Sequence, residues 1–126
     1  MTSPMNKPHD LEERLIDFAV DVINVVEVLP NSKAGNHIAN QLVRSGTSPA
    51  PNYGEARGAE SKKDFVHKLK ISLKELRETS VWLKVIAKKD FCDPPKTKAA
   101  IQESEELIAI FGSRTKTAEG NKQASS

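Results

Sequence analysis

The longest helical pattern in the chain, over residues 61–89, constrains the fold more than any other feature. Ser61 followed by Asp64 resembles a capping box, with Asp in place of the usual Glu, and marks the start of the helix. A helix over these residues measures about 43 Å at about 1.5 Å per residue. One broad arc is suited to a core and comprises Phe65, Leu69, Ser72, Leu73, Leu76, Ser80 and Leu83. A helix this long buries such an arc only against other helices, so the pattern predicts an all-α protein.

Two segments before this helix are also expected to be helical. Apolar residues recur at three- and four-residue spacing over residues 10–29, which predicts a first helix. Residues 32–60 form a second segment that is rich in Ala, Gly and Ser. This segment contains Pro49 and Pro51, each of which removes a helical hydrogen bond and restricts the residue before it. We therefore expect a kink or break at residues 48–52.

A fourth helix follows the long one. Asp93 and Pro94 suit its N-cap and first helical position. Beyond it, residues 115–126 are rich in Lys, Ala, Ser and Thr and are predicted to form a disordered tail. With residues 1–9 as a flexible lead-in, the four segments predict one domain over residues 10–114, an antiparallel up-down four-helix bundle.

The net charge of +2 conceals two helices of opposite charge. Residues 10–29 carry six acidic side chains and one arginine, whereas residues 61–89 carry nine lysine or arginine side chains and three acidic ones. Opposite charge favours packing of these two helices as neighbours and gives the surface distinct poles.

A basic ridge follows one side of the long helix. Its members fall within about a third of the helical circumference, interrupted by Val81, and are Lys63, His67, Lys70, Lys74, Arg77, Lys84 and Lys88. No acidic residue of this helix falls inside the stripe, although a solvated face usually mixes both signs. The ridge predicts salt-dependent binding to the phosphate backbone of RNA or DNA. Weak sequence specificity is expected, since aromatic residues for base stacking make up 5% of the chain. The alternatives are an ordinary solvated face and a surface that docks an acidic protein.

A second arc of the long helix, beside the predicted core, contains Ile71, Trp82 and Val85. A large indole outside the bundle core is unusual for a monomer. These residues predict a subunit seam in a homo-oligomer. The alternative is that Trp82 flanks the core of its own bundle.

A set of polar residues steps by four, four and three along the second segment, namely Arg44, Ser48, Asn52 and Glu55. Glu75 or Glu78 of the long helix can form a bidentate pair with Arg44, and Asn52 can satisfy backbone groups that the prolines free. The pattern predicts a buried polar layer that fixes helix register or subunit packing.

A metal-dependent enzyme is the alternative from a different class. Its ligands would be Glu55, Glu75 and Glu78 with His37 or His67. Di-metal bundles use Glu-x-x-His on two helices, and no Glu in this chain has a His three residues later. The chain also lacks a P-loop, a Gly-x-Ser-x-Gly motif and a dinucleotide fingerprint. We therefore expect no catalytic residues, no metal and no cofactor.

The cellular compartment is predicted from what the sequence lacks. Cys92 is the single cysteine, which excludes an intrachain disulfide. No N-terminal charged-then-apolar signal and no apolar run near 18 residues occur in it. We expect a cytoplasmic protein without a membrane partner.

Several of these motifs together resemble a known family. They are the pair Arg44 and Ser45, Asn52, the pair Glu55 and Ala56, and the run from Lys74 to Leu83 with Glu75, Glu78, Thr79 and Trp82. In this combination the chain resembles the four helix bundle protein family, also called the 23S rRNA intervening-sequence protein family. It is also similar to accessory variability determinant proteins of diversity-generating retroelements.

This resemblance carries further expectations. It implies a four-helix bundle with one long second helix, from which Pro49 and Pro51 depart. It implies a homo-oligomer, with a homopentameric ring as the associated form, and an occurrence beside structured RNA or reverse transcriptases. Several signature residues belong to the polar layer, which we define as Arg44, Ser45, Ser48, Asn52, Glu55, Glu75 and Glu78. We therefore predict a non-catalytic, homo-oligomeric, nucleic-acid-associated scaffold, with a module that binds a protein partner as the alternative.

Overall fold

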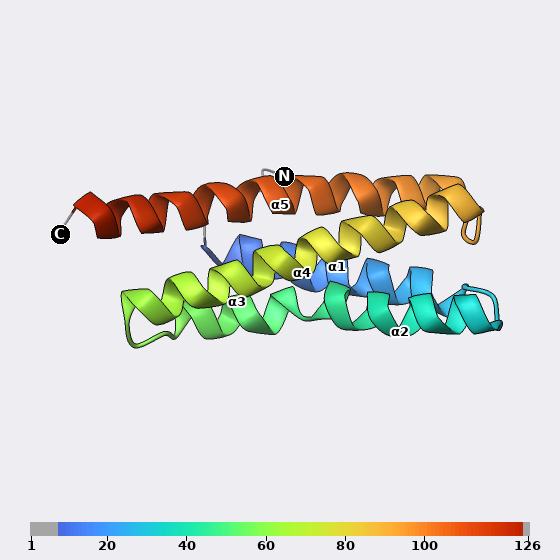
Figure 1. Ribbon diagram of the computed structural model, residues 1–126, viewed down its shortest axis with the longest axis horizontal. Helices are drawn as coiled ribbons and strands as arrows, with labels where there is room; N and C mark the ends of the chain where they lie inside the picture. The colour runs from blue at the N-terminus through green and yellow to red at the C-terminus, as the bar shows by residue number, and fades with distance from the viewer. Residues whose placement is uncertain (1–7, 125–126) are drawn as a thin grey trace.

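A computed structural model describes residues 8–124 of the chain, and all of its regular structure is helical. The helices are α1 (Pro8–Glu27), α2 (Lys33–Thr47), α3 (Pro49–Arg57), α4 (Lys62–Lys89) and α5 (Pro94–Ala124). The chain reverses direction after α1, after α3 and after α4, while α2 and α3 follow one another along nearly the same line (Figure 1). The result is the predicted antiparallel arrangement of four helical rods.

The rods are arranged so that each has two neighbours. The rod formed by α2 and α3 lies between α1 and α4, and α5 packs against α4 and α1. Within residues 8–124, no Cα atom of α1 lies within 8 Å of a Cα atom of α4. The prediction that the acidic and basic helices are neighbours is therefore wrong within one chain: α1 and α4 occupy diagonal positions. Apolar packing rather than surface charge sets this order.

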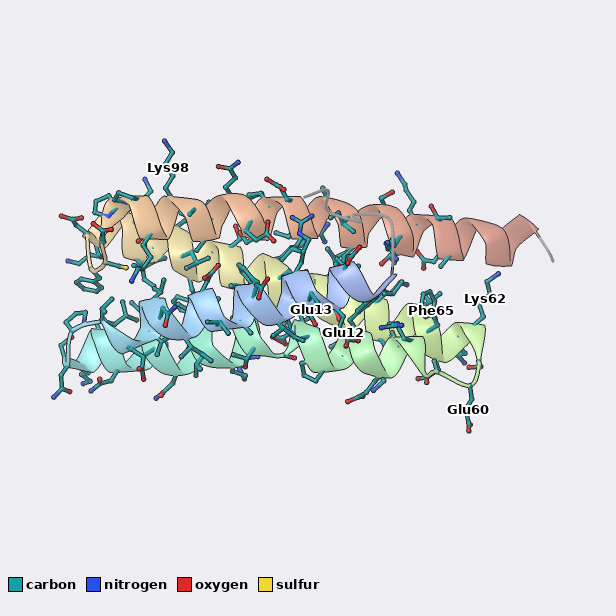
Figure 2. The ribbon with its side chains drawn as sticks, turned by 180° about the vertical axis from the view of Figure 1, so that it is seen from behind. Glu12, Glu13, Glu60, Lys62, Phe65 and Lys98 are labelled. Atoms are coloured by element: carbon teal, nitrogen blue, oxygen red, sulfur yellow. The ribbon has the colours of Figure 1, made fainter. Side chains whose placement is uncertain are left out.

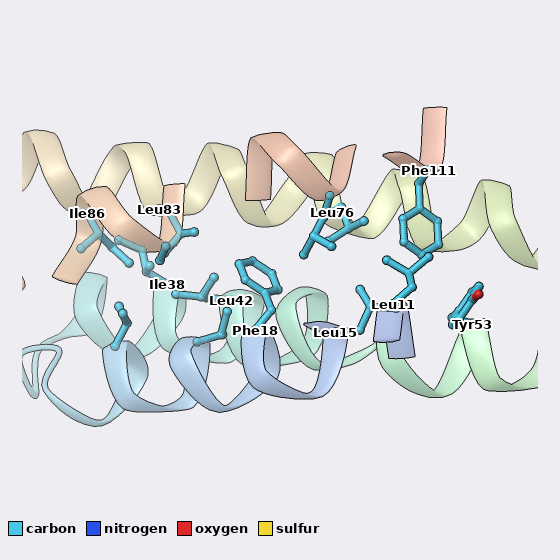
Figure 3. Close-up of a cluster of buried hydrophobic side chains, with 14 of the residues drawn as sticks. Leu11, Leu15, Phe18, Ile38, Leu42, Tyr53, Leu76, Leu83, Ile86 and Phe111 are labelled. Carbon is cyan, nitrogen blue, oxygen red and sulfur yellow. The ribbon is translucent and has the colours of Figure 1, made fainter. Parts of the chain in front are cut away.

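The core runs along the centre of the bundle (Figure 3). Phe18 and Phe111 are its largest fully buried side chains. The ring of Phe111 meets Tyr53 edge to face, with ring centroids 5.7 Å apart. The predicted core arc of α4 is largely confirmed, since Leu69, Ser72, Leu76, Ser80 and Leu83 are buried, while Phe65 and Leu73 are half-buried at its edge.

Gly46 lets α1 and α2 approach closely. A Cβ atom at this position would lie 2.6 Å from Cγ1 and 2.7 Å from Cγ2 of Val22, which is itself fully buried. Any side chain at Gly46 would therefore push the two helices apart or displace the valine.

Of the predicted kink or break, the structure contains a break, at Ser48 between the end of α2 and the first residue of α3. Pro49 and Pro51 have no N–H group, so the helical bonds that would reach the carbonyls of Ser45 and Thr47 are missing. Ser48 nevertheless keeps helical dihedral angles, φ −68° and ψ −37°. Its N–H donates to Arg44 O at 3.2 Å, and its carbonyl accepts from Asn52 N at 3.2 Å. The helix is thus interrupted without a change in its overall course.

The start of α4 is capped as predicted. Ser61 Oγ accepts a hydrogen bond from the N–H of Asp64 at 3.0 Å. The helix ends at Asp90, which adopts the left-handed conformation with φ 57°.

The prediction of a disordered tail from residue 115 is wrong for residues 115–124, which continue α5. Thr115 and Ala118 are buried, and Glu119 forms an ion pair with Lys70 of α4 at 2.6 Å. Packing against the long α4 helix therefore outweighs the tail-like composition. At the other end, α1 begins at Pro8, two residues before the predicted start. The rest of the expected lead-in, residues 1–7, and residues 125–126 lie outside the described part.

Candidate functional site

All seven members of the predicted basic ridge are exposed along α4, and they are Lys63, His67, Lys70, Lys74, Arg77, Lys84 and Lys88. They lie on the side of α4 that faces solvent and the neighbouring α5, because the opposite side is buried in the core. The ridge is therefore available to a ligand in the single chain.

A groove of about 940 Å³ lies between α4 and α5. Lys70, Lys74 and Arg77 line it from α4, and Lys116 lines it from α5. Leu73 and Ile108 contribute apolar surface between the three α4 cations and Lys116. The other lining residues are Ala109, Gly112, Ser113, Thr115 and Glu119. The groove thus has basic walls, and we call it the α4/α5 groove.

The α4/α5 groove continues toward the N-terminus of α4. A smaller hollow of about 230 Å³ is lined by Lys63, Val66 and His67, and it shares Lys70 and Glu119 with the main groove. Five of the seven ridge residues therefore lie along one track, while Lys84 and Lys88 lie farther along α4, outside the residues that line either hollow.

Two ridge lysines have acidic partners on α5. Lys70 pairs with Glu119 at 2.6 Å, and Lys84 pairs with Glu105 at 2.9 Å. Hydrogen bonds from Lys84 and then from Ser80 lower the pKa of Glu105 below its usual value. These side chains are about half exposed, and exposed ion pairs contribute little stability, so a polyanion can displace the carboxylates at low cost. Lys74, Arg77 and Lys116 make no ion pair within residues 8–124.

Lys116 and Glu119 were not recognised in the sequence because they fall in the segment predicted to be disordered. The available signal was the spacing of Thr115 and Ala118 from Ile108 and Phe111, which extends the inner stripe of α5 by two turns.

The polar layer is divided into separate clusters rather than one buried network. In the first cluster, Arg44 Nη1 donates to the two carboxylate oxygens of Glu75 at 2.9 and 3.2 Å, and Arg44 Nη2 donates to Glu78. The predicted pairing of Arg44 is confirmed with both carboxylates. The predicted burial is not, because the Arg44 side chain is 50% exposed.

The other members of the polar layer have different partners. Ser45 is buried, and its Oγ lies 2.9 Å from Thr79 Oγ1, which joins α2 to α4. Asn52 Nδ2 donates to Ser48 O at 3.1 Å and Ser48 Oγ at 2.8 Å. Asn52 therefore does not bind the carbonyls that the prolines free, contrary to prediction. Glu55 pairs with Lys68 at 2.7 Å.

We expect Arg44→Met to destabilise the protein by about 1–2 kcal/mol, because three charge-assisted hydrogen bonds are lost and two carboxylates are left close together. The half-exposed guanidinium limits the loss. Urea unfolding at pH 7 measures this effect. Arg57→Met is the matched control, since Arg57 makes one exposed ion pair with Glu12 at 3.0 Å, and we expect a change within about 0.5 kcal/mol. Equal losses in the two variants would contradict a structural role for the Arg44 cluster.

The predicted seam residues are half-buried. Trp82 Nε1 donates to Glu78 Oε2 at 3.2 Å, and its ring meets His37 edge to face at 5.9 Å. Trp82 and Val85 also pack against the core of their own chain. These contacts favour the alternative in which Trp82 flanks its own core, and the subunit seam of Ile71, Trp82 and Val85 stays a prediction.

The residues considered for a metal site are not brought together. Glu75 and Glu78 are engaged by Arg44, Glu55 by Lys68, and His37 lies against Trp82. Over the described part of the chain, no group of three or more His, Cys, Asp or Glu side chains is placed to hold a metal ion. None of the described helices is both long and apolar enough to cross a membrane.

The fold and the groove define a class: an all-α protein of four packed rods, one of them interrupted, with a cationic groove between the last two. The chain matches the model of the 23S rRNA-intervening sequence protein over residues 9–113 and belongs to that family. It is similar to the crystal structure of a protein with unknown function from the S23 ribosomal protein family of Bacteroides thetaiotaomicron. The two share 31% sequence identity with a TM-score of 0.77, over 84% of this chain and 98% of that one. A comparison with curated proteins gives no match.

The family assignment confirms the resemblance drawn from the motifs. Its matched span includes the ridge and the polar layer but ends before Lys116 and Glu119. The α5 wall of the α4/α5 groove therefore includes residues that lie outside the matched span.

Proposed function

We propose that this chain is a non-catalytic, homo-oligomeric scaffold of the cytoplasm that binds the phosphate backbone of RNA or DNA in the α4/α5 groove. It would use no metal or cofactor. The observation that carries the proposal is the convergence of cations from two helices on one groove: Lys70, Lys74 and Arg77 from α4 and Lys116 from α5. A solvated face of α4 alone would not place a cation of α5 on the same groove.

The spacing of these cations suits a linear polyanion. Lys63 to Arg77 spans about 21 Å of helix, and one strand of a nucleic-acid duplex presents a phosphate about every 3.4 Å along its axis. About six phosphates of one strand therefore fit along the track. Leu73 and Ile108 offer no hydrogen bonds to base edges, which supports binding to the backbone rather than to a particular sequence.

Self-assembly is the second part of the proposal, and a pentameric ring is the form that the family resemblance suggests. It is supported by apolar side chains that the single chain leaves exposed. Val20, Val28 and Val81 are at least 50% exposed, and Ile16 and Ile23 are about 40% exposed. Three of them lie within α1.

The double variant Arg77→Glu/Lys116→Glu tests the groove from both walls, and neither residue has an ion pair to lose within the described chain. We expect it to weaken binding to a mixed-sequence RNA or DNA pool by about tenfold or more at moderate salt. The slope of log affinity against log salt should fall by about two. Fluorescence anisotropy at several salt concentrations measures both quantities.

The matched control is Lys33→Glu/Lys98→Glu, which changes the net charge by the same amount. Lys33 begins α2, and Lys98 points away from the bundle on α5 (Figure 2). We expect it to bind almost as the wild type does. Equal losses of affinity in the two variants would show that binding depends on net charge and not on the groove. A wild-type protein that binds neither RNA nor DNA would overturn the nucleic-acid proposal.

A further inference from the structure

We infer that the carboxylate of Glu119 occupies a phosphate subsite of the α4/α5 groove, and that one phosphate of the nucleic acid replaces it on Lys70. The inference rests on the proposed function and deepens it, because it identifies a point where the backbone is held and the group that competes for that point. It is carried by one acidic side chain that lies among the cations of the groove.

Glu119 is the one acidic side chain among the described residues that line the groove and the smaller hollow beside it. It extends from α5, which lies beside α4 (Figure 1), and it pairs with Lys70 Nζ at 2.6 Å. A lysine ammonium binds a carboxylate and a phosphate through the same kind of charge-assisted hydrogen bond. The Glu119 carboxylate therefore shows where the two helices hold an anionic oxygen.

Two further lysines lie one helical turn from this ion pair. Lys74 follows Lys70 by four residues on α4, and Lys116 precedes Glu119 by three residues on α5. Side chains at these spacings lie on the same face of a helix, and both lysines line the main groove. Neither makes an ion pair within residues 8–124. A phosphate bound to Lys70 is therefore flanked by two lysines that no carboxylate neutralises.

Another ion pair between α4 and α5 is built differently. Glu105 accepts a hydrogen bond from Ser80 Oγ at 2.8 Å and also pairs with Lys84 at 2.9 Å, outside both hollows. Glu119 lacks this second support, since the hydroxyl one turn before it, Thr115 Oγ1, has no hydrogen-bond partner within residues 8–124. Glu119 is thus the carboxylate that a ligand in the groove meets, and it is the less firmly held of the two.

The Lys70–Glu119 pair also lies where the two hollows meet. Both residues line the main groove and the smaller hollow, which adds Lys63 and His67 to the track. With Glu119 in place, a negative charge lies between these residues and the cations of the main groove. A phosphate backbone that takes over Lys70 can follow the cations from Lys63 to Arg77 without this interruption.

The exchange favours ligands that carry several charges. The side chains of Lys70 and Glu119 are 53% and 43% exposed, and exposed ion pairs contribute little stability. The displaced carboxylate nevertheless stays nearby and repels the anion that has replaced it. A single anion therefore gains little from the exchange, whereas a phosphate backbone contacts Lys74 and Lys116 at the same time. Glu119 thus selects polyanions over single anions.

Glu119→Gln tests the inference, because glutamine keeps the size of the side chain and removes its charge. We expect this variant to bind a mixed-sequence RNA or DNA pool about three- to tenfold more tightly than wild type at low salt. Fluorescence anisotropy measures the Kd, and circular dichroism checks that the variant is helical. The matched control is Glu105→Gln, which changes the net charge equally and also breaks an ion pair between α4 and α5. We expect its affinity to lie within about twofold of wild type, since Glu105 lies outside the groove.

A second variant shows whether Lys70 carries the gain. We expect Glu119→Gln/Lys70→Met to lose the added affinity of Glu119→Gln, because the ammonium released from Glu119 is the group that binds the phosphate. A double variant that keeps the whole gain would overturn the subsite, since Lys70 would then not be its ligand.

The other failures are distinguishable. A wild-type protein that binds neither RNA nor DNA would overturn the proposed function and the inference with it. If wild type binds and Arg77→Glu/Lys116→Glu weakens binding, but Glu119→Gln binds as wild type does, only the subsite is overturned. Equal gains in Glu119→Gln and Glu105→Gln would also overturn it, because they would show that affinity follows net charge.

Discussion

Phe111→Ala is expected to destabilise the protein by about 3–5 kcal/mol, the usual cost of truncating a fully buried phenylalanine. The Phe111 side chain is 0% exposed and reaches from α5 to the ring of Tyr53 on α3, the diagonal rod. Its removal leaves a cavity at the centre of the bundle and ends an edge-to-face contact that adds to simple burial. Urea or guanidinium unfolding followed by circular dichroism measures the loss.

A second phenylalanine provides the control for this prediction. Phe91 lies between α4 and α5 and is half-buried, with Lys89 Nζ 5.5 Å from its ring centroid. We expect Phe91→Ala to cost clearly less than Phe111→Ala, since less apolar area is lost from the interior. Similar losses for the two variants would contradict the central position of Phe111.

Gly46→Ala is the second large effect, with an expected destabilisation of about 1–3 kcal/mol from overpacking. Alanine normally stabilises a helix by about 1 kcal/mol relative to glycine. Here the added Cβ would lie 2.6 Å from Val22 Cγ1, and Val22 is a short, fully buried side chain. A substitution that is favourable in an isolated helix therefore becomes unfavourable between two packed helices.

A double-mutant cycle isolates this contact. Val22→Ala alone leaves a cavity and is destabilising, but in the Gly46→Ala background it also removes the clash. We expect the double variant to be more stable than the sum of the two single losses predicts. Strict additivity in thermal or chemical unfolding would show that the two positions do not touch.

The sequence predicted those parts of the fold that depend on local chemistry. The long apolar arc of α4, its Ser61 cap and the helix break beside Pro49 each follow from residues close in the chain, and the structure contains all three. The continuation of α5 past Thr115 was not predictable from composition, because it depends on burial of Thr115 and Ala118 against another helix.

The diagonal placement of α1 and α4 was missed for a related reason. Surface charge is a weak determinant of which helices pack together, whereas apolar faces and short connections fix the order of the rods.

The candidate site was predicted in part. The periodicity of α4 identified the exposed cations, but a single helix cannot show that a groove lies beside it. Lys116 and the pairing of Lys70 with Glu119 appear only when α5 is placed next to α4. The polar layer shows the same limit. Arg44 could be matched to Glu75 or Glu78 from the sequence, but only the structure shows that Glu55 lies apart from them and pairs with Lys68.

Gly112 affects both the stability of α5 and the space inside the α4/α5 groove. It directly follows the core residue Phe111 and lines the α4/α5 groove, and a Cβ atom there would have no neighbour within 4 Å. An alanine would fit and would raise helix stability by about 1 kcal/mol. Its methyl group would also occupy space in the groove between the α4 cations and Lys116. Glycine at this position therefore lowers the stability of α5 and leaves more room in the α4/α5 groove.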